Sequence, residues 1–256
     1  MIRKNYLTPN EQRLWRHIEG KAIVDSELVS MVFPDMGQNK RDKILHGLFQ
    51  KGYLRRAMKG LYFNPKRLDN GYNIALRMHP GYIGLGSALS FHGLSEYESF
   101  TIEVMTRFFR KKAPLESTQY TIEFVPMGKL FTGFERHGSI YVSTVEKTLF
   151  DCLLKPSRVG FANIAKAIYY AEPDWRKFLT FFGLAGNCAL MQRTGYILSL
   201  LEAAGKEVPQ YVYNDLQKGV KTPTRLVPGK GGTYEREWKI QDNLGKERIL
   251  PWIYGN

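Results

Sequence analysis

Five polar side chains with hydrogen-bond donors fall on one face of a predicted helix over residues 38–51. They are Gln38, Asn39, Lys40, Lys43 and His46. The opposite face carries Ile44, Leu45 and Leu48, which we expect to be buried. Glutamine and asparagine can read an adenine edge, and lysine can donate to guanine or to a phosphate. The face therefore predicts contact with duplex DNA, and the alternative is a solvated helix surface, to which Asp42 lends some weight.

A basic hairpin is predicted immediately after this helix. The period changes to extended at Tyr53–Arg56, a turn is expected at Ala57–Gly60, and a second strand at Leu61–Phe63. Phosphate contacts are predicted for Arg55, Arg56 and Lys59.

A second basic cluster carries two aromatic residues, Phe108 and Phe109. Its cations are Arg107, Arg110, Lys111 and Lys112. Cations interleaved with aromatic rings can bind nucleic acid or an acidic partner surface. The interpretation that we favour is a solvated loop that is held in place by these two aromatic residues.

No set of residues converges on a catalytic mechanism, so the sequence predicts a protein that is not an enzyme. Ser87 with Glu96 and Glu98 faintly resembles a nucleotidyltransferase site, but those enzymes use aspartates on a strand. Ser87 with His92 lacks the GxSxG elbow and an orienting acid, so we expect a hydrogen-bonded, buried histidine. The sequence also contains no metal, phosphate-loop or dinucleotide motif, and no cofactor is expected.

The positive charge is concentrated near the N-terminus. Residues 1–67 hold 14 Lys and Arg against 6 Asp and Glu, a net charge of +8 out of +13 for the 256 residues. Neutralising phosphates releases counterions from DNA, so such a basic segment is typical of a nucleic-acid-binding module. The alternative is a generally basic surface.

Composition bounds the class of protein. An apolar content of 43% can form a substantial core, and no stretch reaches the roughly 18 apolar residues of a membrane span. The N-terminus runs into polar sequence instead of a signal-peptide core, which predicts a cytoplasmic location without membrane contact. Two isolated cysteines, Cys152 and Cys188, support neither a disulfide framework nor a zinc site, and both are expected to be buried.

Residues 1–67 are predicted to fold as a winged helix-turn-helix domain. Thr8 to Glu11 is a capping-box helix start, and Asp25 can cap a second short helix before the break at Pro34 to Gly37. Three short helices followed by a basic hairpin form this domain, in which the third helix enters the major groove.

Residues 68–256 are predicted to form a mixed α+β domain with a largely helical C-terminal part. Strands are expected at 101–106, 120–125 and 139–143, and the tail from 224 to 240 is expected to be extended. Ser143 to Glu146 has the pattern of a second capping box, and Lys147 with Asp151 that of an i,i+4 ion pair. Helices are expected at 74–78, 87–93, 162–171, 175–182 and 187–204.

Several phrases in order along the chain resemble the AbiEi family of antitoxin-type transcriptional regulators, from type IV toxin–antitoxin and abortive-infection systems. The phrases are Gly60-Leu61-Tyr62, Gly86 to Leu94, Val145 to Asp151, Arg193 to Leu198, and Leu226-Val227-Pro228 with Trp238-Lys239-Ile240. The resemblance implies a winged helix that binds inverted repeats in its own promoter, as a dimer on DNA. It also implies a C-terminal domain that counteracts a nucleotidyltransferase-like toxin.

Two other functions remain open from the sequence. The first alternative is a winged helix that serves as a protein-interaction module without DNA binding. The second alternative is a cryptic nuclease or nucleotidyltransferase. The charge of residues 1–67 favours DNA over the first alternative, and the missing carboxylate constellation argues against the second.

Overall fold

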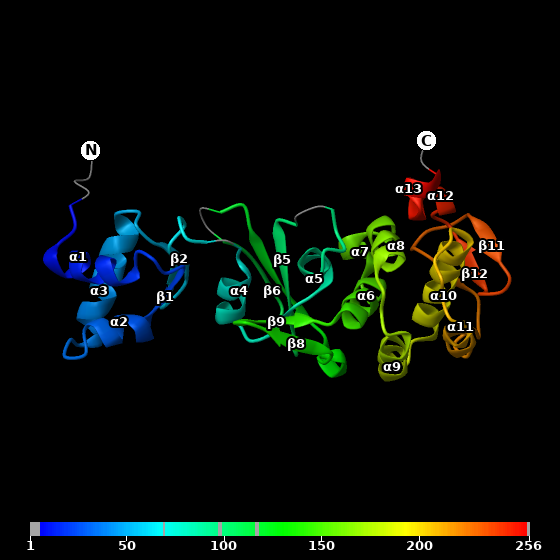
Figure 1. The fold of residues 1–256 in the computed structure, drawn as a ribbon, viewed down its shortest axis with the longest axis horizontal. Coiled ribbons are helices and arrows are strands. Elements are labelled where there is room, and N and C mark those ends of the chain that lie inside the picture. The colour runs from blue at the N-terminus through cyan, green and yellow to red at the C-terminus, as the bar shows by residue number, and fades with distance from the viewer. Residues whose placement is uncertain (1–5, 69, 97–98, 116–117, 255–256) are drawn as a thin grey trace. The chain divides into compact units, whose positions relative to one another are not determined.

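The computed structural model describes residues 6–68, 70–96, 99–115 and 118–254. Glu98, one of the carboxylates weighed above, lies outside the described residues. Helices and strands are mixed along the chain, which confirms the α+β class (Figure 1). The chain divides into two compact units. The first consists of Met1–Gly81, Phe100–Val104 and Arg110–Phe124, and the second of Tyr82–Ser99, Met105–Phe109 and Val125–Asn256.

The first unit begins with the order helix, strand, helix, helix, strand, strand. These elements are α1 (Pro9–Ile18), β1 (Ile23–Asp25), α2 (Ser26–Val32), α3 (Gln38–Gln50), β2 (Arg55–Met58) and β3 (Leu61–Phe63). The strands form an antiparallel sheet in the order β1-β3-β2. Helices and sheet share one core, which contains Leu14, Ile18, Val24, Val29, Phe33, Ile44, Leu45, Leu48, Leu54 and Tyr62.

Local signals place most of these boundaries. Thr8 and Glu11 form the predicted capping box of α1, and Asp25 accepts a hydrogen bond from the Leu28 backbone N–H at the start of α2. Strand β1 was not predicted, because three residues are too few to show a period. The predicted four-residue turn at Ala57–Gly60 is wrong: β2 continues to Met58, leaving a two-residue loop whose Gly60 has a φ of +78°.

The rest of the first unit adds a helix and strands. It contains α4 (Tyr72–Met78), β6 (Lys111–Pro114) and most of β5 (Thr101–Thr106) and β7 (Thr121–Pro126). Strands β6 and β7 are antiparallel, with Lys111 opposite Phe124. Helix α4 contacts β2 and β3, and its Arg77 pairs with Asp25 at 2.8 Å. The additional elements therefore extend the first unit beyond the basic segment.

The second unit combines short strands with a helical region. Its strands are β4 (Tyr82–Ile83), β8 (Phe134–His137), β9 (Ile140–Ser143), β10 (Thr224–Arg225), β11 (Thr233–Glu235) and β12 (Ile240–Asp242). Its helices are α5 (Leu85–Phe91), the 3-10 helix η1 (Gly128–Leu130), α6 (Val145–Leu154), α7 (Pro156–Val159), α8 (Phe161–Tyr170), α9 (Trp175–Ala185), α10 (Cys188–Ala203), α11 (Gln210–Gln217), α12 (Lys246–Ile249) and α13 (Pro251–Tyr254). Strand β9 lies between β4, to which it is parallel, and β8, to which it is antiparallel.

The predicted capping box at Ser143 to Glu146 is wrong by one residue. Thr144 is the N-cap of α6 and accepts from the Lys147 backbone N–H at 3.3 Å. The buried Ser143 hydroxyl instead donates to the Ile83 carbonyl, and the Glu146 carboxylate accepts from the Asp174 backbone N–H at 3.1 Å. These are tertiary partners, which the local sequence does not reveal.

The tail after residue 220 packs tightly on α10. Strands β10, β12 and β11 form a small sheet, and only short pieces of the predicted extended segment are strands. A Cβ at Gly195 would lie 2.0 Å from the Trp238 ring, so glycine allows the indole to touch the helix backbone. The side chain of Gln192 donates to the carbonyls of Thr222 and Trp238, which anchors the tail.

The two cysteines differ in burial. Cys152 is buried as predicted, but Cys188 is only half-buried, because it is the first residue of α10. None of the helices in the described part of the chain has the length and apolar character that a membrane crossing requires.

The predicted Lys147–Asp151 pair forms, and both side chains are 0% exposed. The Tyr82 hydroxyl donates to the other carboxylate oxygen of Asp151 at 3.2 Å. The Lys147 ammonium lies 5.3–5.8 Å from the ring centroids of Tyr82, Phe150 and Phe181. A buried ion pair is tolerated only when its geometry is good and its remaining polar atoms are satisfied. The pair is thus the polar centre of an apolar core.

Burial shifts the protonation equilibria of this pair. It raises the pKa of the Asp151 carboxyl to about 6, against the opposing effects of Lys147 and Tyr82. Burial also lowers the pKa of Lys147, although Asp151 opposes that shift. Each group therefore resists its charged form and depends on the other to keep it.

Replacing one partner of the pair should destabilise the protein more than replacing both. Lys147→Met leaves a buried carboxylate without its cation, so we expect the free energy of unfolding to fall by about 3–5 kcal/mol. The double variant Lys147→Met/Asp151→Leu should lose less than Lys147→Met alone. Denaturant unfolding of the wild type and the two variants measures this. A double variant that loses as much as Lys147→Met, or more, would contradict the coupling.

The raised pKa of Asp151 predicts a pH dependence of stability. The pKa of Asp151 in the folded protein exceeds its unfolded value of 3.8. The contribution of Asp151 to the free energy of unfolding is therefore complete below about pH 4 and is lost as the pH rises through about 6. Relative to Asp151→Asn, the wild type should lose on the order of 1–3 kcal/mol of unfolding free energy over this range. If the free energies of unfolding of the two proteins change in parallel with pH, Asp151 is not the cause of the pH dependence.

Candidate nucleic-acid interface

Helix α3 is braced against α1 by a largely buried ion pair. The Glu11 carboxylate binds the Lys51 ammonium just after α3 and accepts from the Thr8 backbone N–H at 2.6 Å. Burial would raise the pKa of Glu11, but the hydrogen bonds from Lys51 and Thr8 outweigh it and hold the pKa below its ordinary value. A Cβ at Gly47 would lie 2.0 Å from a Glu11 carboxylate oxygen. The absence of a side chain at residue 47 therefore lets the carboxylate lie against α3.

The predicted reading face of α3 is exposed at all five positions, Gln38, Asn39, Lys40, Lys43 and His46. Gln38 donates to Asp42 at 2.7 Å and accepts from Arg41 at 3.2 Å, so its amide is engaged within the helix. The His46 ring packs near Phe49, with centroids 6.0 Å apart. Asn39 and Lys43 make no hydrogen bond to other described residues. Their donors are therefore available to a ligand.

The β2–β3 hairpin presents two of its three predicted cations to solvent. Arg56 and Lys59 are exposed, and the Arg56 Nε–H donates to the Met58 carbonyl at 3.4 Å. Arg55 is half-buried and donates to the Gly52 and Leu54 carbonyls. These two hydrogen bonds hold the Arg55 guanidinium against its own backbone. Arg56 and Lys59 are therefore better placed to bind phosphates.

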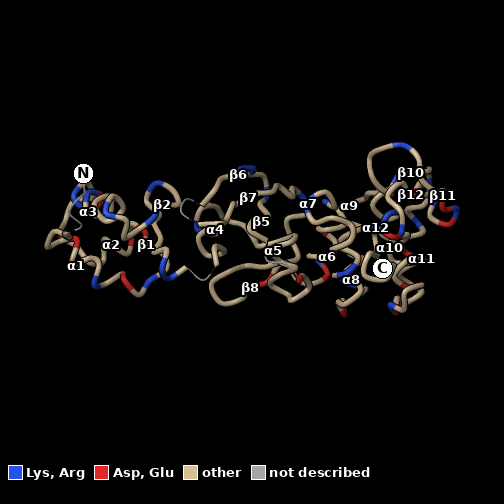
Figure 2. Tube along the Cα trace, turned by 90° about the horizontal axis from the view of Figure 1, so that it is seen from above, with Lys and Arg blue, Asp and Glu red and all other residues tan. Residues whose placement is uncertain are grey.

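The helix and the hairpin belong to one folded piece. Phe49 of α3 contacts Tyr62 of β3, with ring centroids 6.3 Å apart, and Leu54 leads from the shared core into β2. Figure 2 shows Lys and Arg both along α3 and at the hairpin. A single rigid core can therefore position both sets of cations.

Arg13 was missed by the sequence reasoning. Its guanidinium lies 5.1 Å from the centre of the Phe33 ring, and with Lys40 it lines a hollow of about 300 Å³ at the start of α3. An exposed arginine on the polar face of α1 is a weak signal, because only the tertiary packing brings it close to Lys40. Arg13 is an additional candidate for a backbone phosphate.

The second basic cluster is divided between the two units. Arg107 belongs to the second, and its guanidinium lies 5.4 Å from the centre of the Phe108 ring. Arg110, Lys111 and Lys112 belong to the first, and Lys112 pairs with Glu123 at 3.8 Å. All four cations are exposed. The four residues are thus not one preorganised site within a unit.

The residues considered for catalysis have structural partners. His92 is half-buried instead of fully buried, and its Nε2 lies 2.7 Å from the Ser143 carbonyl oxygen. Ser87 is buried within α5. Among the described residues, no three His, Cys, Asp or Glu side chains are grouped so that they could hold a metal ion. Comparisons with models of known protein families and with curated proteins found no match for this chain.

Proposed function

We propose that this protein is a sequence-specific DNA-binding transcriptional regulator that uses its N-terminal segment as a winged helix-turn-helix. The observation that carries the proposal is the exposed row on α3, whose Asn39 and Lys43 side chains make no hydrogen bond to other described residues. In this proposal α2 and α3 are the helix-turn-helix, and β2–β3 is the wing. Asn39 and Lys43 read base edges, whereas Arg56 and Lys59 bind phosphates.

The charge distribution favours DNA over a protein partner for this surface. The net charge of +8 in residues 1–67 suits a polyanion. A protein-interaction module would more often bury an apolar patch than a row of amides and ammonium groups. Two copies bound to an inverted repeat would match the usual symmetry of such regulators.

Binding to DNA should depend on salt concentration. Alanine variants should distinguish the residues that contact bases from those that contact phosphates. Full-length protein should shift a duplex from its own upstream region, with log affinity falling linearly with log salt concentration. Asn39→Ala and Lys43→Ala should each reduce discrimination against random duplex by about tenfold. Arg56→Ala should weaken both duplexes equally.

Lys230→Ala, an exposed lysine in the second unit, is the matched control and should change nothing. If affinity is insensitive to salt, or if no duplex binds, the surface is not a DNA interface. Equal losses for all three variants would assign α3 to the DNA backbone.

We also propose an antitoxin role, which rests on the resemblance of the phrases between Gly86 and Ile240 to antitoxin-type regulators. The phrase Val145 to Asp151 forms part of α6, so the resemblance falls on core elements of the second unit. Neutralisation of a nucleotidyltransferase-like toxin would then be a property of this unit and would not require DNA binding.

Co-expression tests the antitoxin role directly. Full-length protein should restore growth to cells that express a nucleotidyltransferase-like toxin encoded beside it. The variant Asn39→Ala/Lys43→Ala should restore growth equally, because its second unit is unchanged. Rescue by the wild type alone would mean that protection acts through repression, and no rescue by either would remove the antitoxin role.

A further inference from the structure

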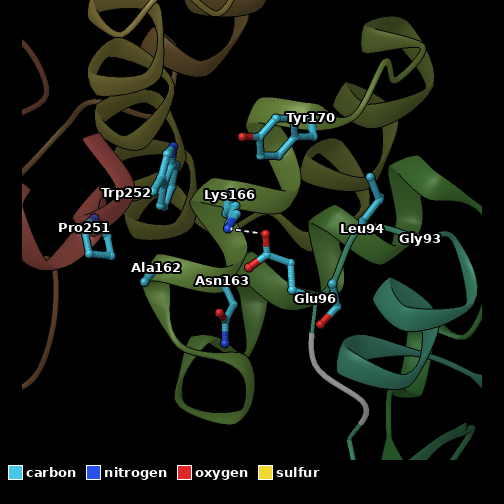
Figure 3. A pocket seen from close by; sticks show the side chains of 10 residues that line it. Gly93, Leu94, Glu96, Ala162, Asn163, Lys166, Tyr170, Pro251 and Trp252 are labelled. Atoms are coloured by element: carbon cyan, nitrogen blue, oxygen red, sulfur yellow. Dashed lines mark ion pairs between the residues drawn. The ribbon is translucent and has the colours of Figure 1, made fainter. Parts of the chain in front are cut away.

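The second unit contains a hollow of about 300 Å³ that the proposed functions do not use (Figure 3). Three segments far apart in sequence line it: residues 93–96 after α5, helix α8, and the short helix α13. The volume is at the small end of the range for small-molecule sites, about 300–1,000 Å³. It suits one ring with a substituent, not a polymer.

Flat aromatic and apolar groups line much of the hollow. Trp252 and Tyr170 contribute rings from α13 and α8, and Tyr170 is 61% exposed. Leu94 and Pro251 add apolar surface. The Trp252 indole nitrogen is buried, and no acceptor for it lies among the described residues. A buried indole N–H usually has an acceptor, so this donor stays unsatisfied among the described residues.

An ion pair between Lys166 and Glu96 brings charge to the hollow. The Lys166 ammonium lies 2.7 Å from the Glu96 carboxylate, drawn as the dashed line in Figure 3. The two partners differ in burial, since Lys166 is 27% exposed and Glu96 is 63% exposed. A pair with one largely solvated partner is weak, so another anion can replace the Glu96 carboxylate on Lys166 at little cost.

A third polar group can orient a ligand. The Asn163 side chain lies at the edge of the hollow and donates one amide hydrogen to the Val159 carbonyl at 2.9 Å. This bond fixes the amide plane and leaves its carbonyl oxygen as an acceptor.

We propose that this hollow binds a small aromatic anion, a flat ring that carries a carboxylate or a phosphate. The ring lies against Trp252 and Tyr170, and the acidic group takes the place of Glu96 on Lys166. Glu96 is thus a built-in competitor that occupies the cation when no ligand is bound. An uncharged ring would leave the Lys166–Glu96 pair intact and would gain nothing from the ammonium.

Calorimetric titration of the full-length protein tests the site with two anions and their neutral counterparts. The probes are salicylate against salicylamide, and adenosine monophosphate against adenosine. At least one anion should bind with a Kd near or below about 1 mM, and about tenfold more tightly than its neutral counterpart. Binding of salicylate alone indicates an aromatic carboxylate, and binding of the nucleotide alone indicates a nucleotide.

Two charge variants should shift the affinity in opposite directions. Lys166→Gln should weaken the anion by about tenfold, and Glu96→Gln should strengthen it by about threefold, because the competitor is removed. Trp252→Ala should weaken it, whereas Trp252→Phe, which keeps a ring, should lose less. Circular dichroism and thermal melting check that each variant is folded.

The matched controls are Lys218→Gln and Asp215→Asn, which alter an exposed ion pair elsewhere in the same unit and should leave binding unchanged. The proposal is overturned if neither anion binds at about 1 mM. It is also overturned if Lys166→Gln and Glu96→Gln change the affinity in the same direction.

Discussion

The buried pair of Lys147 and Asp151 sets a constraint on the whole second unit. Two opposite charges with no exposure to water are stable only while they face each other and their remaining polar atoms are satisfied. That condition holds α6 against Tyr82 of β4 and against Phe181 of α9. A purely apolar core carries no such condition. Moving α6 away from β4 would cost Asp151 its hydrogen bond from the Tyr82 hydroxyl.

The first unit also contains a largely buried ion pair, between Glu11 and Lys51. Glu11 is buried between α1 and α3, where one oxygen of its carboxylate accepts from the Thr8 backbone N–H and from the Lys51 ammonium. The outward face of α3 carries exposed polar residues, such as Asn39 and Lys43. Helix α3 therefore packs into the core with one face and offers a candidate interface with the other.

Prediction from sequence succeeded where the physical cause is local. The capping box at Thr8, the boundaries of α3 and the strand from Thr101 to Thr106 follow from side chains within a few residues of each other. It failed where the cause is distant. The Ser143 hydroxyl has the Ile83 carbonyl as a partner and does not cap α6, and Arg13 lines a hollow with Lys40 only through packing. The hollow beside Trp252 joins segments from three regions of the chain, so no window of sequence contains it.

The close contact between α10 and the tail bears on how the chain is made. Gln192 and the Trp238 carbonyl that it binds are 46 residues apart, and the Trp238 ring rests directly on Gly195. During synthesis α10 must leave the ribosome well before the indole that covers it. The part of α10 that Trp238 covers is then uncovered for the time needed to add those residues. Final packing of the second unit must consequently wait until Trp238 has left the exit tunnel.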